Sequence, residues 1–213
     1  MTDKIKIDII SDVVCPWCII GYKRLEQAMK ELGVEDKFEI QWHPFELNPN
    51  MPIEGENIFE HMAHKYKMSK EKIKESQENL TLMGADLGFK FDRFDEMKIV
   101  NTKDAHLLLA FAKEFGKQTQ LKMRLFEAYF GERKDISNRE ILLEEVKSIG
   151  LDIDLARLRL DDEKAIIALK EEENYWHEKR ISSVPTMVFN NLSALNGAYP
   201  IDTYKQVLLD LIK

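Results

Sequence analysis

The residues best suited to chemistry are Cys15 and Cys18, the only two cysteines in the chain. They frame the tetrapeptide Cys15-Pro16-Trp17-Cys18, which lies between an apolar segment and the expected start of a helix. A spacing of i, i+3 places both sulfurs on one face of the first helical turn, close enough to form a disulfide bond. A pair this close in sequence is typical of a redox site or of two metal ligands.

The position of each cysteine predicts its role. Cys15 lies where the helix leaves free N–H groups, so the helix dipole favours a thiolate there. Cys18 lies one turn further in and should be more buried, so we expect Cys15 to attack a disulfide and Cys18 to resolve the intermediate. Pro16 suits the first helical position, because its missing N–H would have had no partner. Asp12 either raises the pKa of the nearby thiol through its charge or only holds the turn.

Other interpretations of these residues remain open. The cysteines could be two small buried hydrophobic residues near a sheet. A metal site needs four ligands, of which the cysteines supply two, and His61 and His64, spaced i, i+3, could supply the other two. The simpler explanation is that both histidines are solvated residues on a helix of the insertion. We therefore expect no metal. Trp17 either forms an apolar platform beside the attacking sulfur or packs against the rest of the chain. Five methionines similarly form either an adaptable groove over the site or part of a helical core: Met51, Met62, Met68, Met83 and Met97.

The elements that must position the cysteines follow from the hydrophobic pattern. Residues 5–10 alternate and then run apolar, which predicts a buried strand, and residues 38–42 alternate again. Apolar residues between them recur at helical spacing until Gly33. A strand, a helix and a strand over so short a stretch predict a right-handed βαβ unit with a parallel strand pair.

The rest of the chain predicts a helical insertion and a return to the sheet. Prolines and Gly55 interrupt the pattern after residue 43, and helical spacing then runs to about residue 160, with a capping box at residues 137–140. The chain then ends with a charged helix (residues 162–179), a strand that begins at Pro185, a turn, a short strand and a last helix. We therefore expect an α/β domain of residues 1–54 and 158–213, split by an all-helical insertion of residues 55–157 that covers the cysteine face.

Composition excludes several classes of function. The chain has 213 residues and a net charge of −7, which argues against binding to a nucleic-acid phosphate backbone. No apolar run approaches the ~18 residues that a membrane span requires. Its first residues lack the apolar stretch of a secretory signal, so we expect a cytoplasmic protein.

The ordered set of motifs resembles the DsbA-like thioredoxin superfamily, and within it the cytosolic FrnE-like branch. The similarity covers nearly the whole chain. It rests on residues 11–18, 20–21, 24–25, 42–49, 101–102, 105–106, 125–130, 184–186 and 197–198. One departure is the segment 180–183, Arg-Ile-Ser-Ser, which precedes Val184 where family members usually carry a glycine-rich lead.

The resemblance implies an α/β thioredoxin fold with a large all-helical insertion, and dithiol–disulfide exchange by Cys15 and Cys18 as catalytic residues. It also implies a cis Val184–Pro185 bond facing the cysteines, so that Val184 and Pro185, with Pro16 and Trp17, contact the substrate. Substrates would be protein or small-molecule disulfides or dithiols, served by a separate redox partner. No bound cofactor is needed, although glutathione could act as a co-substrate.

Two alternatives remain: a different enzyme, namely a glutathione-dependent isomerase or transferase, and a binding module. Kappa-class glutathione transferases and hydroxychromene-carboxylate isomerases share this fold, but a serine stands where Cys15 stands here. The protein could instead be a non-catalytic adaptor that docks a partner protein on its insertion. The sequence fixes neither the direction of electron flow nor the oligomeric state.

Overall fold

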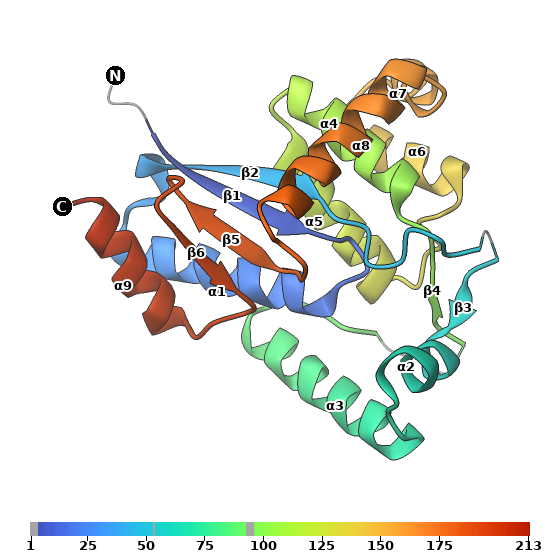
Figure 1. Cartoon of the computed structure of the whole chain (residues 1–213), viewed down its shortest axis with the longest axis horizontal. Coiled ribbons are helices and arrows are strands. Elements are labelled where there is room, and N and C mark those ends of the chain that lie inside the picture. Colours follow the sequence, from blue (N-terminus) through green and yellow to red (C-terminus); the bar gives the residue numbers. More distant parts are fainter. Residues whose placement is uncertain (1–3, 53, 93–95) are drawn as a thin grey trace.

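The four-stranded sheet at the centre of the molecule is built from both ends of the chain (Figure 1). The computed structural model describes residues 4–52, 54–92 and 96–213. Strands β1 (Ile5–Ser11), β2 (Phe38–Pro44), β5 (Thr186–Phe189) and β6 (Ser193–Asn196) follow the order β2-β1-β5-β6. β1 and β2 are parallel and joined by α1 (Pro16–Leu32), which confirms the predicted βαβ unit, and β5 is antiparallel to β1 and β6.

Helices cover both faces of this sheet. α1 and α9 (Ile201–Leu211) pack side by side on one face (Figure 1). Ile7 and Ile9 belong to the main core, whereas Ile10 packs with Trp176 of α8 (Glu163–Glu178) on the other face. Since alternate side chains of a strand point to opposite faces, β1 is buried on both sides.

The segment between β2 and α8 is mostly helical, as its periodicity predicts. Its helices are α2 (Ile58–Tyr66), α3 (Lys70–Asp86), α4 (Lys103–Glu114), α5 (Gln118–Phe126), α6 (Arg139–Ser148) and α7 (Ile153–Leu160). We call the segment from α2 to α7 the helical insertion. Two features escaped the periodicity because they are too short to show one: a ribbon of β3 (Glu56–Asn57) and β4 (Lys98–Ile99), and a π-helical turn (Glu127–Gly131). The expected junction at residues 157–158 lies inside α7, and the division into two domains stays a prediction.

The predicted capping box is wrong by one residue. The side chain of Asn138 caps α6 by accepting hydrogen bonds from the N–H groups of Glu140 and Ile141. Ser137 instead donates its hydroxyl to Asp135 at 2.6 Å. Asparagine is as good an N-cap as serine, so the sequence pattern alone could not decide between the two neighbours.

Gln118 fixes α5 against the edge of the sheet. Its Oε1 accepts the N–H of Trp42 at 3.0 Å, and its Nε2 donates to the carbonyl of Trp42 at 2.9 Å. The side-chain amide therefore pairs with the free backbone N–H and C=O groups of the edge strand β2, as a neighbouring strand would. This contact holds the next turn of α5 near the end of β1, where Lys122 reaches the Ser11 carbonyl.

His43 ties the sheet to α8. Its Nε2 lies 2.6 Å from Oδ1 of Asp8, and its Nδ1 lies 2.6 Å from Oε1 of Glu172. Burial lowers the pKa of His43, but hydrogen bonds to the Asp8 and Glu172 carboxylates outweigh burial, so its pKa is raised above the ordinary value. A protonated His43 donates to both carboxylates and joins β1, β2 and α8.

Replacing His43 with glutamine is expected to lower the free energy of unfolding by about 2 kcal/mol, the order of a hydrogen bond to a charged group. Because the folded-state pKa is raised, this contribution is complete below the ordinary pKa of 6.5 and is lost as the pH rises through the folded-state value. Urea denaturation across a pH series measures it. A difference between wild type and variant that stays constant with pH would contradict this assignment.

Candidate active site

Both cysteines lie at the start of α1, but only one of them reaches open space. Cys15 directly precedes the helix with extended backbone angles (φ −91°, ψ 111°), and Pro16 opens the helix. Both cysteines are free thiols; the Cys15 residue is 4% exposed and Cys18 is fully buried. Cys15 lines a cavity of about 450 Å³, whereas Cys18 is not among the described residues of its wall. A substrate can therefore reach Cys15 but not Cys18.

Val184 and Pro185 lie opposite Cys15. The peptide bond between them is cis, and the Cys15 thiol donates a hydrogen bond to the Val184 carbonyl oxygen at 3.7 Å. The Pro185 carbonyl accepts the N–H of Gly197 at 2.7 Å. The Val184 carbonyl thus holds the attacking thiol in the reduced pair and becomes available when that thiol turns to a substrate.

Pro185 packs closely against Gly21, which lies one turn after Cys18 on α1. A Cβ atom at Gly21 would lie 3.3 Å from Cγ of Pro185 and 3.2 Å from Cε of Met187. Both distances are shorter than ordinary van der Waals contact. A glycine here lets the Val184–Pro185 segment approach the helix that carries the cysteines.

We expect a Gly21→Val substitution to lower the free energy of unfolding by about 1–3 kcal/mol, the usual cost of overpacking a core. It should also slow the reaction of Cys15 with small disulfides, because Pro185 must move away from α1. Lys30→Val, at an exposed position of the same helix, is the matched control for helix propensity. Denaturation and single-turnover thiol oxidation measure the two effects. Equal behaviour of the two variants would show that Pro185 does not depend on close contact with Gly21.

Three buried charged or titratable side chains form a cluster beneath the cysteines: Asp12, His106 and Lys122. Oδ1 of Asp12 lies 3.3 Å from Nε2 of His106, and Oδ2 accepts the N–H of Leu47 at 2.8 Å. Nζ of Lys122 donates to the Ser11 carbonyl at 3.5 Å. The same ammonium group lies 5.3 Å from the ring centre of Trp42 and 5.1 Å from that of Phe126. His106 and Lys122 come from the helical insertion, on α4 and α5.

The cluster sets the charge beneath the site. Burial raises the pKa of Asp12, but the hydrogen bonds from His106 and Leu47 outweigh burial, and the pKa is lowered. Asp12 is therefore a buried carboxylate. Burial lowers the pKa of Lys122 to about 8, against the opposing attraction of Cys18 and Asp12. Lys122 can consequently gain or lose a proton near neutral pH.

The two thiols lie in contact and shift each other's pKa in opposite directions. Contact with Cys18 and burial raise the pKa of Cys15 well above its ordinary value, and Asp12 adds to the rise. Burial also raises the pKa of Cys18, but the hydrogen bond from Cys15 and the charge of Lys122 outweigh burial and lower it. Burial and contact with Cys18 oppose the helix dipole at Cys15, and the assignment of the thiolate to Cys15 stays a prediction. The case for Cys15 as nucleophile rests on access, because Cys15 and not Cys18 is among the described residues of the cavity wall.

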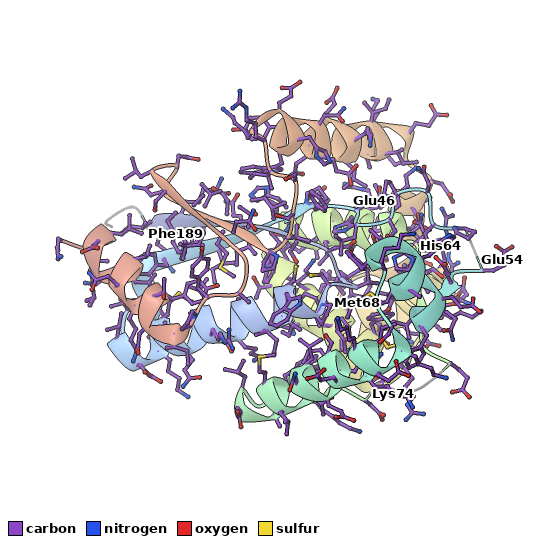
Figure 2. The ribbon with its side chains drawn as sticks, turned by 60° about the horizontal axis from the view of Figure 1, so that its bottom comes forward. Glu46, Glu54, His64, Met68, Lys74 and Phe189 are labelled. Carbon is purple, nitrogen blue, oxygen red and sulfur yellow. The ribbon has the colours of Figure 1, made fainter. Side chains whose placement is uncertain are left out.

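The cavity lies between the cysteine motif and the first part of the helical insertion. Cys15, Pro16, Trp17 and Val184 line one side, and α2 and α3 supply much of the other. Three of the five methionines line it: Met62, Met68 and Met97. In Figure 2, which brings α2 and α3 forward, Met68 lies where these two helices meet. Trp17 is 41% exposed and also lines a second hollow along α3, so it separates the two spaces.

The remaining candidates do not join this site as ligands. His61 lies in the cavity wall, where its Nδ1 is 2.7 Å from Oε2 of Glu56, and His64 is exposed. In the described ranges, no group of three or more His, Cys, Asp or Glu side chains is placed to hold a metal ion. Across the same ranges, none of the helices is both long and apolar enough to span a bilayer.

Comparisons with known proteins match the whole layout. The chain is 26% identical over 207 residues to the uncharacterized protein YwbO of Bacillus subtilis, covering 97% of this chain and 96% of YwbO. A probable DsbA oxidoreductase from Streptomyces coelicolor superimposes with a TM-score of 0.91 at 27% identity, covering 97% of this chain and 89% of the other. The cytosolic disulfide reductase DsbM from Pseudomonas aeruginosa, solved with GSH, has a TM-score of 0.65 at 17% identity over 97% and 98% of the two chains.

The family model for the DSBA-like thioredoxin domain matches residues 6–209. That range takes in both ends of the sheet, the cysteine motif and the whole helical insertion. It confirms the expected thioredoxin fold with a large helical insertion. The chain belongs to the DSBA-like thioredoxin domain family.

Proposed function

We propose that this protein is a thiol–disulfide oxidoreductase that uses the Cys15–Cys18 pair on protein or small-molecule disulfides and dithiols. The observation that carries the proposal is the unequal access of two thiols in contact. Cys15 lines the cavity, whereas Cys18 is fully buried and its pKa is lowered in part by the charge of Lys122. An attacking and a resolving thiol need this arrangement. The family and the Streptomyces coelicolor relative support the class of activity.

The exchange proceeds in two balanced steps. The Cys15 thiolate attacks one sulfur of a substrate disulfide, forms a mixed disulfide and releases the first substrate thiolate. The Cys18 thiolate then attacks the Cys15 sulfur, forms the Cys15–Cys18 disulfide and releases the second. The two protons of the protein dithiol end on the two released thiols. The reverse sequence oxidises a substrate dithiol, and the relative reduction potentials set the direction.

Lys122 and Asp12 assist through their charges. Lys122 stabilises the Cys18 thiolate, and because its pKa is about 8 it can exchange a proton near neutral pH. The pair itself is the redox group, so we propose no bound cofactor, with glutathione as a possible co-substrate that returns the pair to its starting state. We place the protein in the cytoplasm and in the FrnE-like branch, on the motifs around residues 11–18 and 42–49.

The test compares the wild-type protein with the Cys15→Ser/Cys18→Ser double variant. Reduced protein is mixed with oxidised glutathione, and mass spectrometry follows formation of the internal disulfide, while insulin reduction in the presence of a dithiol measures turnover. We expect both reactions in the wild type and neither in the double variant. Full insulin reduction by the double variant would remove the thiols from the mechanism and favour an adaptor role.

A further inference from the structure

The cavity beside Cys15 restricts what can reach the nucleophile. Cys15 is 4% exposed, and the space it meets is the cavity of about 450 Å³ enclosed with the help of α2 and α3. A substrate must therefore place its sulfur inside this cavity. The volume is in the range that accommodates a small organic molecule, and most of such a ligand would be buried.

The wall of the cavity is apolar and lacks cationic side chains. Ile58, Ile73, Leu80, Ile99 and Phe130 contribute to it, and no lysine or arginine is among its described residues. Enclosing an unpaired carboxylate in such surroundings is costly, because the charge loses its hydration without gaining a partner. The wall therefore favours an uncharged substrate over one that carries carboxylates, as oxidised glutathione does.

One polar group of the wall has no partner. Nε2 of Gln77, on α3, is buried without a hydrogen bond. Two other polar side chains of the wall are engaged: the Tyr129 hydroxyl donates to the Lys98 carbonyl at 2.7 Å, and Nδ1 of His61 lies 2.7 Å from Oε2 of Glu56. A buried amide donor that lacks an acceptor costs free energy, which a ligand carrying an acceptor would recover.

We propose that the cavity binds small, uncharged, apolar disulfides that carry a carbonyl or similar acceptor, and that Gln77 donates to this acceptor. The inference rests on the proposed function and assigns its substrate class. Cys15 attacks one sulfur of such a disulfide while its apolar body fills the space between Trp17 and α3. Cys18 then completes the exchange, so that one disulfide and the protein dithiol yield the protein disulfide and two small thiols.

The experiment follows single-turnover oxidation of the reduced full chain by three probe disulfides. 4,4′-Dithiobis(benzamide) is neutral and carries amide carbonyl acceptors. 4,4′-Dithiobis(benzoate) has the same aromatic disulfide body but carries two negative charges. Bis(2-hydroxyethyl) disulfide is small and polar. Rates with free dithiothreitol correct for the intrinsic reactivity of each probe. After this correction we expect wild-type protein to prefer the benzamide over the benzoate by about 10-fold or more, since only the benzoate buries charge.

Three variants on one helix locate the effect. Gln77→Leu removes the donor at similar size, and Ser76→Trp, at a half-buried position of the wall, fills the cavity. Glu78→Trp, at an exposed position of α3 outside the wall, is the matched control. We expect Gln77→Leu to slow the benzamide by about 5-fold, the scale of one neutral hydrogen bond. Ser76→Trp should slow both aryl probes more, whereas Glu78→Trp, which lies outside the wall, should leave the rates of all three probes at the wild-type value.

The outcomes separate the two proposals. If no probe oxidises the wild-type pair, the proposed function itself fails. If all three probes react in their intrinsic ratio, or if Gln77→Leu and Ser76→Trp behave as Glu78→Trp does, the oxidoreductase survives and the assigned substrate class is overturned. Circular dichroism checks that each variant is folded, and Gln77→Leu decides the question should Ser76→Trp not fold.

Discussion

Replacing Cys15 with serine is expected to abolish disulfide exchange, with a loss of about 1,000-fold or more, because a hydroxyl cannot replace the nucleophilic thiolate. Cys18→Ser should behave differently. Contact with Cys18 is the largest cause of the raised pKa of Cys15, so removing the Cys18 thiol should lower the pKa of Cys15. Cys15 should then react faster with alkylating agents at neutral pH than it does in the wild type.

The Cys18→Ser variant should also retain the first step and lose the second. After incubation with oxidised glutathione it should carry one glutathione per chain on Cys15, since no neighbouring thiol remains to release it. Mass spectrometry of the intact chain and of its Cys15 peptide detects the adduct. An unmodified Cys18→Ser chain, or one in which Cys15 alkylates more slowly than in the wild type, would contradict the roles assigned to the two thiols.

The second large effect is expected at Lys122, whose charge helps to hold the pKa of Cys18 down. In Lys122→Met the Cys18 pKa should rise, and the thiolate absorbance of the reduced protein should appear at higher pH. Removing the cation also leaves the buried Asp12 carboxylate with less compensation. We expect the free energy of unfolding to fall by about 3 kcal/mol, the scale for breaking a buried charge cluster.

A double-mutant cycle tests whether Lys122 acts through Asp12. The Asp12→Asn/Lys122→Met variant should lose less stability than the two single variants together, by about 1 kcal/mol or more, because each single change leaves the other charge buried. Gln120→Met, at an exposed position of α5, controls for the change of residue on this helix and should leave the Cys18 titration at its wild-type position. Additive losses would show that the two charges act independently.

The sequence predicted the framework of the site because that framework depends on local signals. Alternation in residues 5–10 and the stop at Gly33 place the cysteines between β1 and α1, and Gly33 indeed ends the helix with φ 64°. Which side chains lie beneath and opposite the cysteines depends on contacts between distant segments. Lys122 offered only a weak signal, a lysine one position after Leu121 and three before Leu125 on the buried side of α5. Gln77 offered none, because an unpaired amide shows only after folding.

The electrostatic surroundings of Cys15 depend on folding in the same way. The helix dipole acts on any group at the start of α1 and can be inferred from sequence. Contact with Cys18 and burial of Cys15 oppose the dipole, and the burial arises only when the helical insertion covers the site. Asp12 shows the same dependence on folding: its charge raises the Cys15 pKa, and its side chain accepts the N–H of the distant Leu47.

The origin of His106 and Lys122 on α4 and α5 constrains how this fold can evolve. A segment inserted into a loop can ordinarily be shortened, exchanged or lost while its host domain persists. Here the host contributes a buried acid, and the inserted segment contributes its partners. In a chimera that took its insertion from a relative lacking His106 and Lys122, the Asp12 carboxylate would stay buried without these two partners. The two parts are therefore expected to be inherited as a unit, and substrate range in this lineage should diversify through α2 and α3, which can change without touching the buried charges.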